Sequence, residues 1–213
     1  MMIIKIILIL VSVIVTFFHL VLIRAQKVKW INLTKPLIIP SILLYYILAA
    51  SQINIVIITA LLLSLLGDIL LMQEIHLFKF GLISFAAAHI SYTLYFLFNS
   101  IKGIETVQYA VLLLPYAVLC VFIYAKLLKK STFMKAYFVA YMVIIATMSY
   151  WSLCMVFAKG TLQIWMTFIG SLSFIVSDGA LAFGLINGEK KNNPIIVMAT
   201  YAAAQLLIVS GLL

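Results

Sequence analysis

Residues 60–72 read Ala60-Leu-Leu-Leu-Ser64-Leu-Leu-Gly-Asp68-Ile-Leu-Leu-Met72, an apolar run that holds a single carboxylate. Residues 170–183, Gly170-Ser-Leu-Ser-Phe174-Ile-Val-Ser-Asp178-Gly-Ala-Leu-Ala-Phe183, repeat this arrangement, and the sequence contains no other aspartate. Both runs are apolar enough to form membrane helices. A carboxylate near the centre of a bilayer costs about 2.5–3.5 kcal/mol on insertion scales, so an acid retained there is a functional candidate.

The rest of the composition agrees with a membrane protein. Of the 213 residues, 67% are hydrophobic and only 9% are charged, and the mean hydropathy is +1.28. Long apolar runs with little sequence between them leave no room for a soluble domain. The net charge of +9 would suit a nucleic-acid partner, but the lysines lie in short loops between apolar runs, which is the usual place for topology-setting charge. We therefore expect no nucleic-acid partner.

The apolar runs predict an all-α fold, a polytopic integral membrane bundle of eight transmembrane helices in a single domain over residues 1–213. The first run is long enough to span a bilayer and no small-residue cleavage site follows it, so we interpret it as a retained helix. We expect Pro36 in the first turn of the second helix and a kink at Pro40. The expected helices lie at about residues 3–23, 34–50, 53–73, 78–100, 106–128, 132–157, 161–186 and 193–213.

The loop charges predict the orientation. Eleven of the 14 Lys and Arg residues fall on one side of this arrangement, and only Lys5, Lys102 and Lys159 fall on the other. The eleven are Arg24, Lys27, Lys29, Lys35, Lys79, Lys126, Lys129, Lys130, Lys135, Lys190 and Lys191. The positive-inside rule then predicts a multi-pass protein of the cell membrane with both termini outside the cytoplasm.

The two aspartates fall at similar depths in helices that run in the same direction. Asp68 lies about five residues, and Asp178 about eight residues, before the cytoplasmic end of its helix, which at about 1.5 Å per residue is a difference of about 5 Å. They can share one site if their helices are neighbours, which the sequence does not decide. Each acid can instead bond a neighbouring helix and play no chemical role.

Other polar side chains accompany the acids, and each has a structural interpretation too. Ser64 lies one turn before Asp68, whereas Ser177 adjoins Asp178 but points about 100° away. His89 and Tyr92 share a face of the fourth helix, where His89 can equally be a packing histidine and Tyr92 suits amphipathic packing. Tyr150, Tyr201 and Gln205 suit helix packing as well as a site, and Lys35 suits a topology-setting role as well as a ligand. The candidates are Lys35, Ser64, Asp68, His89, Tyr92, Tyr150, Asp178, Ser177, Tyr201 and Gln205.

We expect no metal and no other cofactor. A catalytic zinc site takes about three protein ligands with a defined spacing. The three histidines, His19, His76 and His89, form no His-x-x-x-His pair, and Cys120 and Cys154 lie inside apolar runs. His89 with both aspartates could form a zinc site, but metal-free acid–base chemistry fits the pattern better.

Several strings in the expected order resemble the YhhN-type membrane family, which includes the lysoplasmalogenases. The resemblance runs from about residue 33 to the C-terminus. It rests on the strings Lys35-Pro36-Leu37, Ser64-Leu-Leu-Gly-Asp68-Ile-Leu-Leu-Met72, Gly81-Leu-Ile-Ser-Phe85, His89-Ile-Ser-Tyr92, Ser177-Asp178 and Tyr201-Ala-Ala-Ala-Gln205-Leu-Leu-Ile208. It implies an eight-helix membrane hydrolase that acts on a lysophospholipid with a 1-alkenyl chain and has membrane lipid around it. The products would be a fatty aldehyde and a glycerophospho-base.

A vinyl ether is hydrolysed by protonation on carbon, which gives an oxocarbenium ion that water then captures. We hypothesise that Asp68 and Asp178 supply one protonated carboxyl as donor and one ionised carboxylate beside the developing cation. Burial and mutual repulsion favour this division of a single proton, which parallels paired-carboxylate glycoside hydrolysis. Which aspartate is the donor stays open at this stage.

Three other functions remain open. A proton-coupled transporter or channel would use the same acids as a relay, although the sequence predicts no broken helix. A zinc-dependent, ceramidase-like lipid hydrolase would lose activity with a chelator. In a non-catalytic lipid-binding protein, the aspartates would only join helices. Nothing in the sequence sets an oligomeric state.

Overall fold

The computed structural model describes residues 2–72, 75, 77–101, 103, 105–126, 132–187 and 193–213. Over these ranges the chain forms helices and turns and no strands, which confirms the all-α prediction. The helices are α1 (Met2–Arg24), α2 (Val28–Thr34), the 3-10 helix η1 (Lys35–Leu37), α3 (Ile38–Ala49), α4 (Ile55–Leu70), α5 (Phe78–Ser100), α6 (Thr106–Lys126), α7 (Thr132–Lys159), α8 (Leu162–Asn187) and α9 (Asn193–Gly211).

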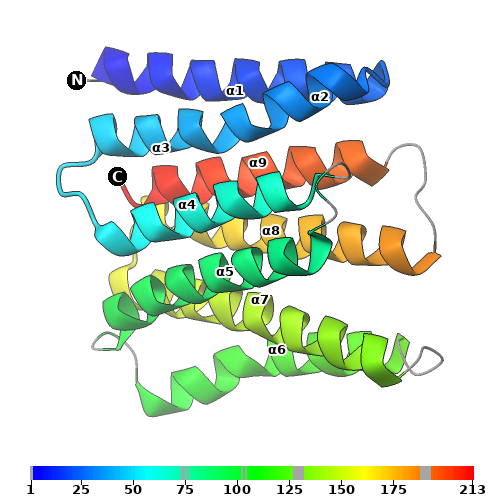
Figure 1. Cartoon of the computed structure of the whole chain (residues 1–213). Helices are drawn as coiled ribbons and strands as arrows, with labels where there is room; N and C mark the ends of the chain where they lie inside the picture. Colours follow the sequence, from blue (N-terminus) through cyan, green and yellow to red (C-terminus); the bar gives the residue numbers. More distant parts are fainter. Residues whose placement is uncertain are drawn as a thin grey trace.

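These elements make eight passes up and down the bundle, because α2, η1 and α3 together form the second pass (Figure 1). Both termini therefore lie at the same end of the bundle. Except at the start of the second pass and at the end of α4, which ends at Leu70, three residues before the predicted end, the described helix boundaries fall within about two residues of the predicted ones. The predicted ends at residues 73 and 128 lie outside the described ranges.

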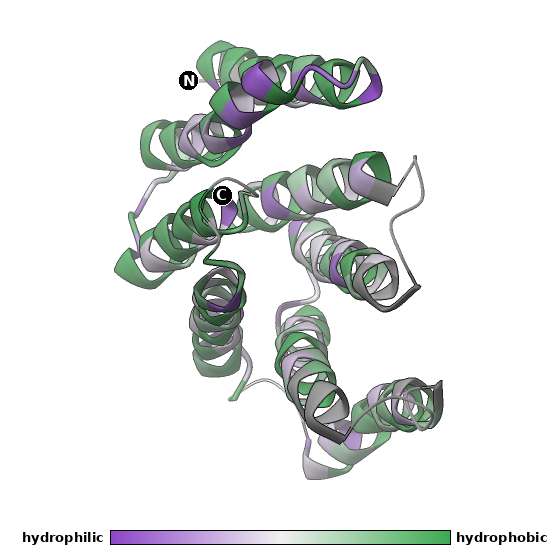
Figure 2. Ribbon diagram, turned by 45° about the vertical axis from the view of Figure 1, so that its right-hand side comes forward, coloured by the Kyte–Doolittle hydropathy of each residue, from purple (hydrophilic) through white to green (hydrophobic). Residues whose placement is uncertain are grey.

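Among the residues that the structure describes, six helices are long and apolar enough to cross a membrane. Two further apolar helices in the described ranges, Ile55–Leu70 and Thr106–Phe122, are shorter. Hydrophobic residues extend along the helices, including the peripheral ones (Figure 2), and side chains such as Phe17, Phe98 and Leu114 are mostly exposed. A soluble bundle would carry polar residues on such faces, so this surface is typical of a multi-pass membrane protein.

The second pass differs from its prediction. It begins at Val28, six residues before the expected start, and the α-helix is interrupted at Lys35–Leu37. Pro36 consequently lies in the middle of the pass, where it lacks an N–H group and its ring clashes with the carbonyl of the preceding turn. Pro40 instead lies in the first turn of α3, where proline is tolerated. The expectation that no helix is broken, and that Pro40 makes the kink, is therefore wrong.

The helices that carry the two aspartates are bridged by other helices. Within the described ranges α4 packs mainly against α5, and α8 packs most extensively against α9. Close approach of α8 to α9 depends on Gly170, since a Cβ there would lie 2.8 Å from the carbonyl oxygen of Ala204. Because α4 and α8 are not closely packed partners, side chains of α5 and α9 have to connect the acids.

The charged residues divide between the two ends of the bundle. Arg24, Lys27 and Lys79 lie at the end opposite the termini, whereas Lys5 and Lys159 lie at the end of the termini (Figure 1). These residues agree with the charge asymmetry predicted from the sequence, but Lys35, which is counted there as a loop residue, lies inside the second pass. Several residues in that count, namely Lys102, Lys129, Lys130, Lys190 and Lys191, lie outside the described ranges.

Candidate functional site

Asp68 occupies the last turn of α4 and is nearly inaccessible, with 2% of its surface exposed. One carboxylate oxygen, Oδ2, accepts a hydrogen bond of 2.7 Å from the hydroxyl of Tyr201 on α9. The other, Oδ1, lies 3.9 Å from the Nζ of Lys35. A buried carboxylate thus receives a cation from the interrupted second pass and a hydroxyl from the last helix.

The helix interruption explains how Lys35 reaches the acid. Lys35 is the first residue of η1, directly before Pro36, and η1 packs against α4. Its side chain is only 16% exposed. The ammonium group is therefore directed into the bundle, so Lys35 is more than a topology-setting residue.

A second set of contacts lies one helical turn from Asp68. The side-chain amide of Gln205 donates to the hydroxyl of Ser64 at 2.8 Å and its oxygen accepts from the hydroxyl of Tyr92 at 2.7 Å. Ser64 in turn donates to the carbonyl of Ala60. The step from Asp68 back to Ser64 on α4 matches the step from Tyr201 forward to Gln205 on α9. In antiparallel helices, a residue one turn earlier on one helix faces a residue one turn later on the other. The Asp68–Tyr201 and Ser64–Gln205 contacts are therefore consistent with each other.

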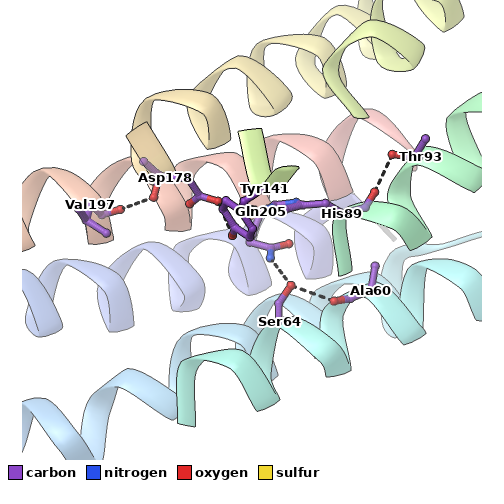
Figure 3. A network of polar contacts seen from close by, with 9 residues as sticks. Ala60, Ser64, His89, Thr93, Tyr141, Asp178, Val197 and Gln205 are labelled. Carbon is purple, nitrogen blue, oxygen red and sulfur yellow. Dashed lines mark hydrogen bonds and ion pairs between the residues drawn. The ribbon is translucent and has the colours of Figure 1, made fainter. Parts of the chain in front are cut away.

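Asp178 lies near the middle of α8 and has a different set of partners. Its Oδ2 lies 3.2 Å from the Nε2 of His89 on α5 and accepts a hydrogen bond of 2.8 Å from the hydroxyl of Tyr141 on α7. Figure 3 shows His89, Tyr141 and Gln205 gathered between Ser64 and Asp178. The three helices α5, α7 and α8 therefore converge on this second carboxylate.

Aromatic rings fill the space between the two acids. The ring of Phe174 packs edge-on against the imidazole of His89 and against the ring of Tyr201, with distances between ring centroids of 4.8 Å and 5.8 Å. The ring centroids of Phe85 and Tyr201 lie 5.6 Å apart. Phe85 also packs on Gly67, where an added Cβ would lie 2.6 Å from the Phe85 ring. We call Lys35, Asp68, His89, Tyr141, Asp178 and Tyr201 the carboxylate network.

Two of the sequence candidates lie away from this network. Ser177 donates to the carbonyl of Val197 at 3.1 Å and so joins α8 to α9, in line with its predicted direction. Tyr150 donates to the carbonyl of Tyr109 on α6 and packs edge-on against Tyr116. The structure brings together the other eight candidates, namely Lys35, Ser64, Asp68, His89, Tyr92, Asp178, Tyr201 and Gln205.

Near Tyr150 lies another group of buried polar side chains, which we call the hydroxyl cluster: Tyr116, Ser149, Ser152 and Ser171. Ser149 contacts Tyr116 at 2.9 Å and accepts from Ser171 at 2.9 Å, and Ser152 lies 2.8 Å from Ser171. These residues join α6, α7 and α8 and carry no charge. Every hydroxyl has a partner within the cluster, which is what a buried structural contact requires.

The sequence favours packing roles for Tyr141 and for Phe85, which shares the face of His89, and does not indicate Phe174 at all. Nothing distinguishes Tyr141 in the sequence, which contains 11 tyrosines and 14 phenylalanines. A signal exists only once α7 is placed, because its partner Asp178 belongs to another helix. Tyr141 is identified as a site residue only when the structure shows which face of α7 packs toward Asp178 on α8.

The donor set for a metal is small. Among the residues that the structure describes, no three His, Cys, Asp or Glu side chains converge as a metal site would need. His89 and Asp178 form a pair, while Asp68 has Lys35 as its neighbour. His76 lies outside the described ranges. No metal-dependent step is assigned to these residues.

The sequence model of the YhhN family matches residues 28–212. The chain belongs to the YhhN family. This confirms the resemblance read from the motifs, and the match includes all ten candidate residues. It begins at α2 and so leaves out α1. Searches of curated proteins and of solved structures find no significant match.

Proposed function

We propose that this YhhN family member is an integral membrane lysoplasmalogenase, which hydrolyses the vinyl ether bond of a 1-alkenyl lysophospholipid. The products would be a fatty aldehyde and a glycerophospho-base. The observation that carries the proposal is the pair of buried aspartates with separate partner sets, Lys35 and Tyr201 for Asp68, His89 and Tyr141 for Asp178. Family membership is consistent with a hydrolase.

We further propose that the eight passes span the cell membrane with both termini outside the cytoplasm. The even number of passes brings the termini to one end, where Lys5 and Lys159 lie, and more of the described cations lie at the other end. By the positive-inside rule, the end with Arg24, Lys27 and Lys79 faces the cytoplasm. Asp68 in the last turn of α4 then lies near the cytoplasmic side, where a lysolipid head group would rest.

The reaction needs a proton on carbon and a negative group beside the cation that follows. Protonation of the outer vinyl carbon converts the enol ether into an oxocarbenium ion, with its positive charge shared between carbon and oxygen. One carboxyl group of the pair supplies the proton and the other, ionised, stabilises this charge, as in glycoside hydrolysis. Water adds to the cationic carbon, and the hemiacetal releases the aldehyde and the glycerol hydroxyl.

The remaining candidates have supporting roles in this proposal. Gln205, held by Ser64 and Tyr92, presents a fixed amide one turn from Asp68. Tyr201 orients the Asp68 carboxylate, and Lys35 balances its charge, with its partial exposure also leaving it open to the phosphate of the substrate. Ser177 fixes α8 and with it Asp178, whereas Tyr150 would act only through the packing of α7.

A direct test is to measure aldehyde release from a 1-alkenyl lysolipid in membranes that contain the protein. We expect release that depends on the protein and little cleavage of the matching 1-acyl lysolipid, because an ester is not opened by protonation of an alkenyl carbon. Equal cleavage of both lipids would indicate a general lysophospholipase. Absence of aldehyde from correctly folded protein would refute the proposed activity.

One observation favours a second candidate, a proton-coupled transporter. The interruption at Lys35–Leu37 places a cation against Asp68 in the middle of a pass, and broken helices often mark transport sites. Such a protein would carry protons across liposomes without hydrolysing lipid. Proton flux measured with a pH-sensitive dye, in the presence and absence of the alkenyl lysolipid, separates the two functions.

A further inference from the structure

The two buried aspartates differ in the kind of base that faces them. Asp68 lies 3.9 Å from the ammonium group of Lys35, whereas Asp178 lies 3.2 Å from the imidazole of His89. A lysine is a compact fixed cation, while a histidine can both bind and release a proton near neutral pH. Asp178 therefore has a partner with which it can exchange a proton, whereas Asp68 faces a fixed cation.

We propose that the transferable proton belongs to the Asp178–His89 pair, and that His89 is the catalytic group that passes it, through Nδ1, to the substrate. Asp68 stays ionised throughout and stabilises the oxocarbenium charge. This inference rests on the proposed function and deepens it. It replaces a proton shared between two aspartates with one shared between an aspartate and a histidine.

Two polar neighbours of Asp68 favour its negative form. Both of its oxygens have a positive or hydrogen-donating neighbour, since Lys35 approaches Oδ1 and Tyr201 donates to Oδ2. Donation of hydrogen bonds to a carboxylate and a nearby cation both stabilise the ionised group. A carboxylate held in this way keeps its charge as a positive intermediate forms, which suits a stabiliser better than a proton donor.

The imidazole of His89 has one occupied and one free nitrogen. Nε2 faces Asp178, but Nδ1 is buried and has no hydrogen-bond partner among the described residues. The side chain is 1% exposed and is enclosed by the rings of Phe174 and Tyr141. Buried polar atoms are nearly always paired, so an unpaired one suggests a role with a bound molecule. Nδ1 is thus the atom that can meet a substrate or a water molecule.

Asp178 fixes the imidazole for this role. Its carboxylate accepts the Nε2–H, which holds the ring orientation, while Tyr141 donates to the same oxygen from a third helix. A carboxylate that orients a histidine in this way also stabilises the positive imidazolium. The geometry leaves Nδ1 free to give a proton and to take one back.

The proposed step balances in atoms and charge. The Nδ1–H of the imidazolium donates its proton to the outer vinyl carbon, the π electrons form the new C–H bond, and the neighbouring carbon and ether oxygen become an oxocarbenium ion. Water adds to that carbon and returns a proton to Nδ1, which restores the imidazolium. In the hemiacetal the hydroxyl proton is lost as the carbonyl forms, the bond to the glycerol oxygen breaks, and that oxygen takes up a proton.

One variant tests the role of Nδ1. Glutamine places its amide nitrogen near the position of Nε2 and has no atom at the position of Nδ1. His89→Gln therefore keeps a donor for Asp178 but loses the free nitrogen, and we expect the folded variant to release aldehyde about 10²–10⁴-fold more slowly, the usual contribution of an acid–base group. Turnover of His89→Gln within about twofold of wild type would overturn the proposal.

A second measurement tests the interaction between Asp178 and His89 by NMR and does not depend on enzymatic turnover. The chain has only three histidines, so ¹⁵N-histidine labelling of the full-length protein in detergent gives three imidazoles, and the one lost in His89→Gln is His89. We expect Asp178→Asn to shift its two nitrogen signals strongly and Asp68→Asn to leave them nearly unchanged. The reverse result would overturn the pairing.

The two tests also separate this inference from the proposed function. Wild-type protein that releases no aldehyde, yet shows the His89 response to Asp178→Asn, would refute the lysoplasmalogenase proposal and keep the Asp178–His89 proton pair. Aldehyde release that survives in His89→Gln but is lost in both aspartate variants would keep the function and refute the catalytic role of His89.

Discussion

The carboxylate network and the hydroxyl cluster are both buried polar groups between helices, yet they are built differently. The hydroxyl cluster joins α6, α7 and α8 through uncharged groups that satisfy one another. The carboxylate network brings ionisable side chains from the second pass, α4, α5 and α8 into one core, and Nδ1 of His89 has no hydrogen-bond partner among the described residues. A closed set of hydrogen bonds suits a helix contact, whereas charge and an unpaired atom suit chemistry.

The most direct test of this difference between the two regions is to remove the negative charges of Asp68 and Asp178 one at a time. We expect Asp68→Asn and Asp178→Asn each to lower aldehyde release by about 10²–10⁴-fold, because one loses the cation stabiliser and the other the partner of His89. Glu105→Gln, which changes an exposed acid, is the matched control and should keep full activity. Normal turnover in both aspartate variants would show that the paired acids have no catalytic role.

The next largest effect should come from the fixed cation. Lys35→Gln leaves Asp68 without its positive partner, and we expect turnover to fall about 10–100-fold, about 1.4–2.7 kcal/mol in the barrier. Lys35→Arg keeps the charge and should retain most of the activity. The loss of stability should be smaller than the roughly 3–5 kcal/mol of fully buried pairs, since Lys35 is 16% exposed. Equal turnover in the two variants would show that the charge of Lys35 is not needed.

A pair of tyrosines compares the two regions directly. Tyr201 and Tyr116 are both buried, and the hydroxyl of each has a side-chain partner, Asp68 and Ser149 respectively. Each change to phenylalanine should lower the free energy of unfolding by about 1 kcal/mol, seen as a similar loss of thermal stability in detergent. Only Tyr201→Phe should also slow turnover, by about tenfold. If Tyr116→Phe slows turnover as much, the contrast between the regions is wrong.

The smallest effect is expected within the hydroxyl cluster itself. Ser171→Ala removes a hydroxyl that donates to Ser149 and contacts Ser152. We expect a loss of about 1 kcal/mol in stability, measured by thermal unfolding, and no change in aldehyde release. A tenfold loss of turnover at unchanged stability would indicate that the cluster takes part in the reaction.

The sequence predicted the helices well because apolar periodicity and length depend on local residues. The predicted start of the second pass is six residues too late, because Lys29, Asn32 and Thr34 interrupt the apolar residues of the stretch Val28–Thr34 and leave no continuous apolar run. That error moved Pro36 from mid-helix to a first turn. The mistake therefore also hid the interruption that directs Lys35 toward Asp68.

The site was only partly predictable, because a pattern gives the face of a helix but not its neighbour. Pairs one turn apart, such as Ser64 with Asp68 and Tyr201 with Gln205, were expected to share faces, and the structure shows that they do. Tyr141 and Tyr150 lie nine residues apart, which at about 100° per residue places them on opposite sides of α7. Only the packing of α7 shows that Tyr141, and not Tyr150, faces Asp178.

The ion pair between Lys35 and Asp68 has a consequence for how the protein is made. The two residues belong to consecutive passes, 33 positions apart along the chain, so they leave the ribosome as parts of one helical hairpin. On the proposed topology, this hairpin can neutralise its own acid before the rest of the bundle exists. Asp178 emerges long after its partner on α5, so its charge is accommodated only when the late helices join the early ones.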